Sequence, residues 1–185
     1  MVSQFVSPDK VRLLGQLDFN FPEGTHAIGR LDNHSEGLLI LTTNKKVTKL
    51  LFESKDPHTR TYLVQVKNIV SEETLHLLRT GIDIVIEGSA IYKTTPCDVQ
   101  KVSKPSWLYD GPFMHREAYP HSWLLITLTE GKFHQVRKMV AAAGHQCQRL
   151  LRVSIENIHL EGMQPGEVRE LDEKDFFERL RIVYP

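Results

Sequence analysis

Apolar and polar residues alternate along two stretches of the chain, residues 60–67 and 122–129. Alternation with a period of two, in segments rich in Val, Leu, Ile and aromatic residues, predicts β-strands with one buried face. Shorter segments between turn-forming residues predict further strands. These segments are residues 26–31, 38–42, 82–86, 98–102, 148–153 and 155–160.

Apolar residues at a spacing of three and four predict fewer helices, which are scattered between the strands. The amphipathic stretches are residues 45–54, 71–81, 133–143 and 172–181, with a short additional helix that begins at residues 7–9. Ser71 and Asp172 are favoured residues at the start of a helix, and Gly81 and Gly144 are favoured at the end. This order of elements predicts an α+β fold with a mixed, largely antiparallel sheet and a few flanking helices.

Residues 1–185 show no internal repeat and no shift in composition that would mark a domain boundary. A single domain is expected at this length. Residues 103–120 contain three prolines and the aromatic residues Trp107, Tyr109 and Phe113. We interpret this segment as a long ordered loop. Because long loops are often functional, it is a candidate for selecting a substrate.

Composition gives expectations about the compartment. No apolar run approaches the roughly 20 residues needed to span a bilayer, and the first residues do not resemble a signal peptide. Cys97 and Cys147 are the only cysteines, so no disulfide framework is indicated. These features predict a cytoplasmic protein with reduced thiols and no membrane partner.

Lysine and arginine together number 23, and so do aspartate and glutamate, which gives a formal net charge of zero. A neutral chain argues weakly against a strongly basic nucleic-acid-binding protein. The charges are nevertheless segregated, because residues 132–152 contain five basic residues and no acidic one, whereas residues 167–178 are mainly acidic. The basic stretch is compatible with a local nucleic-acid-binding surface. Equally, each charged stretch can be a solvated face without a partner.

The histidines in the second half of the chain do not have the spacing of metal ligands. His115, His121, His134 and His145 are not accompanied by cysteines or carboxylates in a zinc-binding pattern. The chain also has no glycine-rich phosphate loop and no nucleophile elbow around a serine. Carboxylate chemistry is therefore the class left to consider.

The turn at Asp32 is the main local candidate for such chemistry. Two apolar segments flank a polar turn that opens with this single carboxylate, and Gly29 and Gly37 bracket it. Glycine permits backbone conformations and close approaches that a Cβ atom would block. A carboxylate held in a tight turn between buried strands can act as a nucleophile or a base. The alternative is that Asp32 only caps the turn by accepting hydrogen bonds from nearby backbone.

A basic helix later in the chain offers a partner for this carboxylate. Phe133, Val136, Met139 and Val140 fall on one apolar face of the predicted helix, and Arg137 lies outside that face. Arginine is always charged and pairs with carboxylates through a bidentate fork, which would keep the carboxylate ionised. The alternative is a surface helix whose cations are solvated.

Several motifs in a fixed order resemble the RsuA-type rRNA pseudouridine synthases, and most closely the RluE-like members of that family. The resemblance covers nearly the whole chain. It rests on Gly-Arg-Leu-Asp at residues 29–32 with Ser35 and residues 37–42, on residues 60–66, on residues 126–132 with residues 135–139, and on Leu-Leu-Arg at residues 150–152. Residues 105–108 and 122–124 strengthen the similarity to the RluE-like members.

The resemblance implies an enzyme that isomerises uridine to pseudouridine in 23S rRNA, in the course of rRNA processing and ribosome biogenesis. Asp32 would be the catalytic aspartate, Tyr62 would stack on the uracil, and Arg137 would hold the Asp32 carboxylate by an ion pair. The bond from ribose to N1 of uracil would break, the base would turn, and C5 would rejoin the ribose. Members of this family use no cofactor and no metal.

RNA binding follows from the same chemistry. The target uridine must leave its stack to reach a buried acid at a cost of a few kcal/mol, and stacking on an aromatic ring returns roughly 1–3 kcal/mol. Basic residues can hold the phosphates around the flipped nucleotide. The candidate residues for RNA contacts are Arg30, Lys132, Gln135, Lys138, Arg149, Leu150 and Arg152.

The resemblance also implies two differences from the family pattern. The accessory RNA-binding domain that several relatives carry is not found, and the first strand of the family is expected ahead of Met1. We therefore expect residues 1–185 to form a catalytic domain whose sheet is incompletely covered near the N-terminus and whose stability is reduced. A monomer is expected.

Other functions remain open. The same fold can serve as a catalytically silent RNA-binding module, which would not need the Asp32 carboxylate, or as a synthase acting on another structured RNA. An unrelated alternative is a glycoside hydrolase, which places two carboxylates on either side of the scissile bond. Glu36 and Glu130 are the candidates for the second carboxylate.

Overall fold

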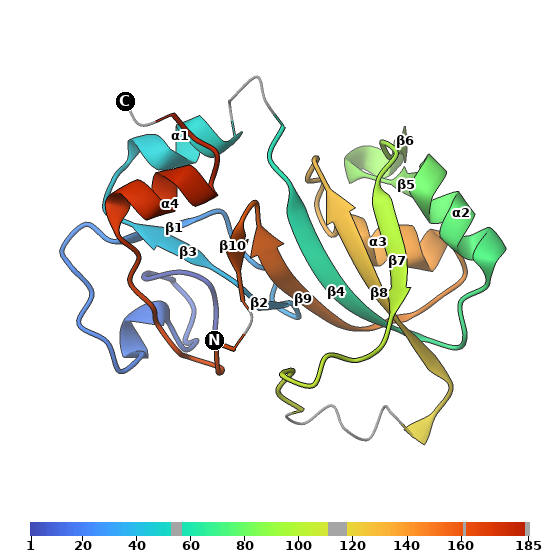
Figure 1. Ribbon diagram of the computed structural model, residues 1–185, viewed down its shortest axis with the longest axis horizontal. Coiled ribbons are helices and arrows are strands. Elements are labelled where there is room, and N and C mark those ends of the chain that lie inside the picture. The colour runs from blue at the N-terminus through green and yellow to red at the C-terminus, as the bar shows by residue number, and fades with distance from the viewer. Residues whose placement is uncertain (53–56, 111–117, 161, 184–185) are drawn as a thin grey trace.

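The computed structural model describes residues 1–52, 57–110, 118–160 and 162–183. A large curved sheet runs through the centre of the molecule, and smaller elements lie on either side of it (Figure 1). Within the described ranges, no helix is long and apolar enough to cross a membrane. Cys97 is a free cysteine.

The central sheet is antiparallel along its main path. Its strand order is β10 (Ile158–His159), β9 (Cys147–Ile155), β4 (Arg60–Lys67), β8 (His121–Leu128) and β7 (Asp98–Val102). A further strand, β2 (Glu36–Gly37), pairs with β9 in the parallel direction. The alternating strand β4 occupies the middle of the sheet and is hydrogen-bonded along both edges, which fixes the faces that its side chains present.

Two small ribbons and several helices complete the fold. The ribbons are β1 (His26–Ile28) with β3 (Ile40–Thr42), and β5 (Asp83–Val85) with β6 (Ile91–Lys93). The α-helices are α1 (Lys46–Phe52), α2 (Glu72–Thr80), α3 (Gln135–Ala142) and α4 (Glu173–Arg179), and the 3₁₀ turns are η1 (Leu14–Gln16) and η2 (Glu87–Ser89). In Figure 1, α1 and α4 lie beyond the β10 edge of the sheet, whereas α2, α3 and the β5–β6 ribbon lie together over one face.

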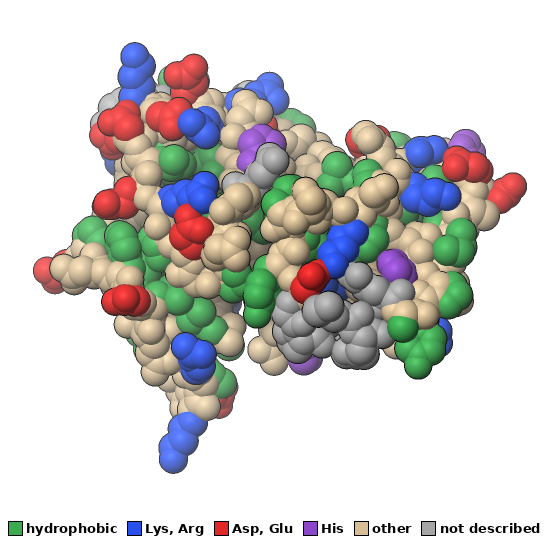
Figure 2. All heavy atoms as spheres, turned by 60° about the horizontal axis from the view of Figure 1, so that its bottom comes forward, with side chains coloured by type: hydrophobic (Ala, Val, Ile, Leu, Met, Phe, Trp, Pro, Cys, Tyr) green, Lys and Arg blue, Asp and Glu red, His purple; other side chains and the backbone are tan. Residues whose placement is uncertain are grey.

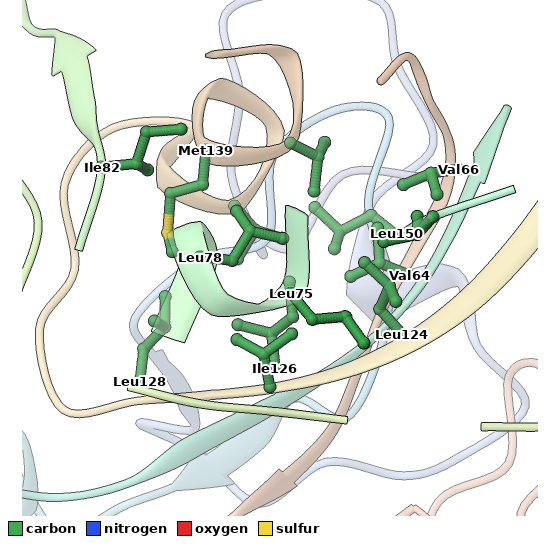
Figure 3. Packing of buried hydrophobic residues seen from close by; sticks show 14 of the residues in the cluster. Val64, Val66, Leu75, Leu78, Ile82, Leu124, Ile126, Leu128, Met139 and Leu150 are labelled. Carbon is green, nitrogen blue, oxygen red and sulfur yellow. The ribbon is translucent and has the colours of Figure 1, made fainter. Parts of the chain in front are cut away.

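The main apolar core lies between that face of the sheet and helices α2 and α3. Figure 3 shows Leu75 and Leu78 of α2 and Met139 of α3 directed toward Ile126 of β8. The alternation of β4 contributes every second residue, including Val64, to this core. Burial of such aliphatic side chains contributes about 1.5–3 kcal/mol each, so the helices are held to the sheet by this contact.

Two smaller apolar clusters cover other parts of the sheet. One joins Val47 of α1 to Phe177 of α4 beneath the β1–β3 ribbon. The other lies on the opposite face of the central sheet, where Leu108 packs against Leu63 and Trp123. The described part of the segment after β7 therefore covers that face of the sheet.

Charged side chains of both signs are interspersed on the face of the molecule shown in Figure 2. This agrees with the formal net charge of zero. No large field of one sign is visible on this face.

Most predicted elements are confirmed. The α+β class and the largely antiparallel sheet match the observed topology. Strands predicted at residues 60–67 and 98–102 have the predicted bounds, and α2 and α4 begin after Ser71 and Asp172, whose side chains accept hydrogen bonds from backbone N–H groups of the first turn. The helix predicted at residues 45–54 is confirmed over α1, and residues 53 and 54 lie outside the described ranges.

Other predictions are wrong in part. The helix predicted after residues 7–9 is replaced by η1, because backbone groups of Arg12 and Leu14 bond to Val2 and Gln4 rather than along a helix. The strand predicted at residues 38–42 begins only at Ile40 as β3, and neither β2 nor β6 was predicted. The strand predicted at residues 26–31 ends at Ile28, because Gly29 adopts a positive φ of 69°.

Gly37 lies at the closest approach between β2 and β9. Its φ is +107°, and a Cβ atom there would lie 2.3 Å from the carbonyl oxygen of Arg152. The same carbonyl accepts a hydrogen bond of 2.8 Å from the N–H of Leu38. Only glycine allows this close approach without backbone strain. Gly37 therefore fixes where the preceding turn contacts the sheet.

We predict that Gly37→Ala lowers the free energy of unfolding by about 2–4 kcal/mol, because it adds backbone strain and a backbone clash. Gly24→Ala is a matched control, since Gly24 also has a positive φ of 81° but has no atom within 4 Å of its Cβ position. The control should lose only about 1–2 kcal/mol. Urea denaturation of both variants measures the difference, and equal losses would show that the β2–β9 contact is not tight.

Candidate active site

A pocket of about 240 Å³ lies beside the turn at Asp32, where the start of β4 and the end of β8 adjoin the middle of β9. Its walls come from three parts of the chain that are distant in sequence: residues 29–35, the strand ends, and residues 130–136. The motifs that predicted the site are separate in the sequence, and the fold brings them together in this pocket.

The strands supply the floor of the pocket. Tyr62 of β4 is opposite Arg152 of β9 in the sheet register, so both side chains stand on the same face. Arg60, two residues before Tyr62, lines the same pocket and is opposite Leu128 of β8. An aromatic ring and two guanidinium groups thus come from neighbouring strands, which hold them rigidly.

Asp32 lies in the turn between β1 and β2 and lines the pocket. The N–H of Ser35 bonds to the main-chain carbonyl of Asp32 at 2.8 Å, so the backbone itself closes the turn and leaves the carboxylate for another partner. Ser3 Oγ accepts the N–H of Leu31 at 3.0 Å and fixes the turn from the N-terminal segment. The Asp32 side chain is 31% exposed, which leaves it accessible to a ligand.

The predicted ion pair between Asp32 and Arg137 does not form in the described structure. Nη2 of Arg137 instead donates to the carbonyl oxygen of His34 and to Ser35 Oγ, the latter at 3.4 Å. The side chain that approaches Asp32 is His134, whose Nε2 lies 3.6 Å from the Asp32 carboxylate. The physical reason is geometric: Arg137 lies one turn further along α3, so it reaches the backbone after Asp32. Arg137 therefore braces the turn through its peptide groups.

Arg152 is the cation most deeply placed in the pocket. It is 5% exposed, and its Nε donates to the carbonyl oxygen of Leu38 at 2.9 Å. Its Nη2 is buried and has no hydrogen-bond partner among the described residues. Burial lowers the pKa of Arg152, while Tyr62 and Asp32 favour its charged form. A buried donor without a partner is costly in a folded protein, so this group is suited to a ligand.

Glu130 organises the opposite wall. Its carboxylate accepts hydrogen bonds from Tyr92 Oη at 2.5 Å, from the Thr95 N–H at 3.0 Å and from Gln135 Nε2 at 2.6 Å. Partial burial raises the pKa of Glu130, but these hydrogen bonds outweigh it and hold that pKa below its usual range. The hydrogen bond between Tyr92 and Glu130 raises the pKa of Tyr92. Gln135 in turn accepts the N–H of Lys132 at 2.8 Å, whereas the hydrogen bond from Tyr92 of β6 ties this wall to the β5–β6 ribbon.

The remaining predicted contact residues divide into two groups. Arg30, Lys132, Gln135 and Leu150 line the pocket. Arg149 instead directs its Nε and Nη2 to Glu36, each at 3.0 Å. Lys138 lies beside the pocket wall, where its Nζ is 5.6 Å from the centre of the Phe133 ring.

The long segment after β7 does not line this pocket in its described part. Leu108 packs on the opposite face of the sheet, as noted above. Residues 111–117, where its substrate-selecting role was also predicted, lie outside the described ranges. That role stays a prediction.

Arg60, Phe133 and His134 line the pocket and were not among the site residues predicted from the sequence. Arg60 could have been found, because it precedes Tyr62 by two residues on one strand and must share its face. His134 and Phe133 were assigned to a helix that begins only at Gln135, so their positions in the pocket wall followed from no periodic signal. The arrangement as a whole offers a carboxylate, an aromatic ring and a donor-rich cation around one half-open space.

Comparison with known proteins agrees with the family seen in the motifs. The chain matches the RNA pseudouridylate synthase family over residues 9–142. It is 36% identical to the ribosomal large subunit pseudouridine synthase E of Vibrio vulnificus (strain CMCP6), over 92% of this chain and 70% of that protein. It is 34% identical to the protein of the same name from Xanthomonas axonopodis pv. citri (strain 306), over 89% of this chain and 85% of that protein.

A solved structure supports the same conclusion for the fold. A crystal structure of pseudouridylate synthase superimposes with a TM-score of 0.74 at 26% identity, covering 97% of this chain and 68% of that one. The expected fold class and the expected resemblance are thus confirmed.

The hydrogen bonds to Glu130 predict an acid-sensitive part of the stability. Because its pKa is held below the ordinary value of 4.5, the ionised carboxylate stabilises the fold fully above that value, and this contribution disappears as the pH falls through the lowered pKa. Glu130→Gln should therefore be less stable than the parent near neutrality, with a difference that shrinks below about pH 4.5. Urea denaturation across pH measures it.

Tyr92→Phe is the matched variant for this prediction, since it removes one of the hydrogen bonds to the carboxylate. Its pH dependence should lie between those of the parent and Glu130→Gln. If all three proteins gave parallel curves down to low pH, Glu130 would have no special role in the fold.

Proposed function

Since the chain belongs to the RNA pseudouridylate synthase family, we propose that it isomerises uridine to pseudouridine in large-subunit (23S) ribosomal RNA. Relatives that bear the name ribosomal large subunit pseudouridine synthase E support this choice of substrate. The observation that carries the proposal is the meeting of Asp32, Tyr62 and Arg152 in one pocket.

The pocket has groups suited to each part of the reaction. The bond from C1′ of the ribose to N1 of uracil breaks, the base turns, and C5 bonds to C1′ while its proton is lost and N1 gains one. Asp32 can attack C1′ as a nucleophile or remove a ribose proton as a base. Tyr62 provides an aromatic face against the uracil near C5. The exchange of one glycosidic bond for another within a nucleotide has no net redox change, and the proposal includes no cofactor or metal.

Cationic residues take different roles in this proposal. Arg152 offers its unpartnered Nη2 to an oxygen of the substrate beside Asp32. Arg137 acts on the turn, because it holds the carbonyl group of His34 and so positions the carboxylate two residues earlier. Arg30 and Lys132 are placed to meet phosphates at the pocket rim, where they contribute to affinity.

Residues 1–185 act as the catalytic domain in this proposal. The protein works as a monomer in the cytoplasm, during rRNA processing and ribosome biogenesis. Its RNA substrate presents the uridine in a single-stranded or bulged region, because the base must enter a pocket at the end of a sheet.

The glycoside hydrolase alternative is weakened by the contacts of its second carboxylate. Glu36 is held by both Nε and Nη2 of Arg149, and Glu130 accepts hydrogen bonds from Tyr92 and Gln135. Glu130 lines the pocket, but its pKa is held below its usual range by these hydrogen bonds, which does not suit a general acid. A catalytically silent RNA-binding module and a synthase for another structured RNA are tested by the experiments below.

We predict that Asp32→Asn abolishes pseudouridine formation, with a rate loss of at least about a thousandfold, while RNA affinity stays close to that of the parent. Chemical mapping of pseudouridine in unmodified large-subunit rRNA measures the reaction, and filter binding measures affinity. Asp83→Asn, at an exposed carboxylate on β5, is the control and should be fully active. Activity equal to the parent in Asp32→Asn would refute the catalytic assignment, and no modification by the parent would favour the silent binding module.

Arg152→Lys should lower kcat by roughly 10- to 100-fold. Lysine keeps the charge, but it cannot bond to Leu38 and also direct a second donor into the pocket, and a charge-assisted hydrogen bond contributes about 1.5–3 kcal/mol. Arg169→Lys, at an exposed ion pair with Glu167, is the control and should leave kcat unchanged. Single-turnover kinetics give the rates, and thermal denaturation checks the fold. An unchanged kcat in Arg152→Lys would show that the donor does not act on the substrate.

A further inference from the structure

We propose that Phe133 is a stacking platform for the nucleobase that neighbours the target uridine, an inference that rests on the proposed function. The Phe133 side chain lines the mouth of the pocket and is 73% exposed. Such a large exposed ring is unfavourable in water, so its position calls for a ligand with a flat apolar face.

The backbone turns this ring outward. His134 adopts a left-handed conformation with φ of 55°, so α3 begins only at Gln135 and Phe133 stays outside the helix. In the predicted longer helix, Phe133 would share a buried face with Val136. A left-handed conformation at a residue other than glycine carries strain, and strain of this kind is often kept at functional sites.

The turn that carries Phe133 is held firmly at both ends. The N–H of Lys132 donates to the side chain of Gln135 at 2.8 Å, and the N–H of Gln135 donates to the carbonyl of Lys132 at 3.0 Å. The amide of Gln135 also donates to Glu130. The ring is therefore presented by a fixed turn, which lowers the entropy that a ligand loses on stacking against it.

A stack of rings leads from the carboxylate of Asp32 to the pocket mouth. The Phe133 ring stacks on the His134 ring with centroids 3.9 Å apart and an interplanar angle of 19°. Nε2 of His134 lies 3.6 Å from Asp32. A uridine held at Asp32 would thus place its neighbour in the strand near Phe133, because successive nucleotides are joined by a short backbone.

The charges around the ring favour a nucleotide as the occupant. Lys138 Nζ lies 5.6 Å from the centre of the Phe133 ring, whereas Lys132 Nζ lies over the Tyr92 ring of the same pocket wall. An aromatic ring beside a cation matches a base joined to a phosphate. When the uridine leaves its stack to enter the pocket, its neighbour loses a stacking partner, and Phe133 replaces it.

The test uses short single-stranded RNA that carries the fluorescent base 2-aminopurine on one side or the other of a single uridine. Stacking on an aromatic ring quenches this fluorophore. The parent protein and Phe133→Tyr should quench one of the two RNAs, whereas Phe133→Ala and Phe133→Leu should not. Affinity for that RNA should fall about fivefold to a hundredfold in the alanine and leucine variants. Ile69→Ala, at an exposed apolar residue beyond the opposite end of β4, is the control and should behave as the parent.

A second measurement removes the neighbouring base instead of the ring. With an abasic nucleotide on the quenched side of the uridine, the parent and Phe133→Ala should bind equally. Equal affinity of the two proteins for intact RNA would overturn the proposal, as would full retention by Phe133→Leu or a loss that persists with abasic nucleotides on both sides. The last result would indicate another occupant, such as an apolar protein surface.

These readouts are separate from the proposed function. Quenching and affinity measure stacking on Phe133 even if the parent protein forms no pseudouridine. A failure of the isomerase assignment can therefore be distinguished from a failure of the stacking proposal. If the parent is active, Phe133→Ala should lower kcat/KM for that RNA by about the factor by which it lowers affinity, because the ring binds a base of the substrate.

Discussion

The approach of β2 to β9 is the contact on which the pocket depends. At Gly37 the backbone of the turn meets the backbone of Arg152 without an intervening side chain, and reciprocal hydrogen bonds join Leu38 to Arg152. This contact holds the Asp32 turn against the central sheet, at the point where the strand register places Tyr62 beside Arg152. The Asp32 carboxylate lies on a loop but is therefore positioned as accurately as a side chain on a strand. Chemistry at a single bond requires this accuracy.

Much of this arrangement follows from local patterns in the sequence. The pattern of β4 predicted its bounds, but not that both of its faces are buried, with Val64 in the main core and Leu63 in the cluster on the opposite face. Side-chain direction in a strand depends only on position along it, so Tyr62 shares the face of Val64. Capping residues marked α2 and α4 for a similar reason. Asp32 alone was ambiguous, since a turn-capping acid and a catalytic acid have the same local sequence. The order of motifs along the chain made the catalytic interpretation preferable.

What escaped prediction depends on non-local geometry. Helical spacing placed Phe133 on a buried face, but a single left-handed residue at His134 moved the start of α3 and turned the ring to solvent. Arg137 was expected to hold the carboxylate of Asp32, and it holds the carbonyl of His34 instead. Both atoms belong to the same turn, and which one an arginine reaches is decided by ångström-scale differences that spacing along the sequence does not encode.

The contacts that hold the pocket together join residues far apart in the chain. Arg137 and His34 are 103 positions apart, and Arg149 and Glu36 are 113 apart. Closing such long loops costs entropy that no local contact repays, so the pocket has no stability apart from that of the whole sheet. The Asp32 turn therefore acquires its cationic and aromatic neighbours only when folding is nearly complete, and a partly folded chain exposes this acid to RNA without the groups that direct it.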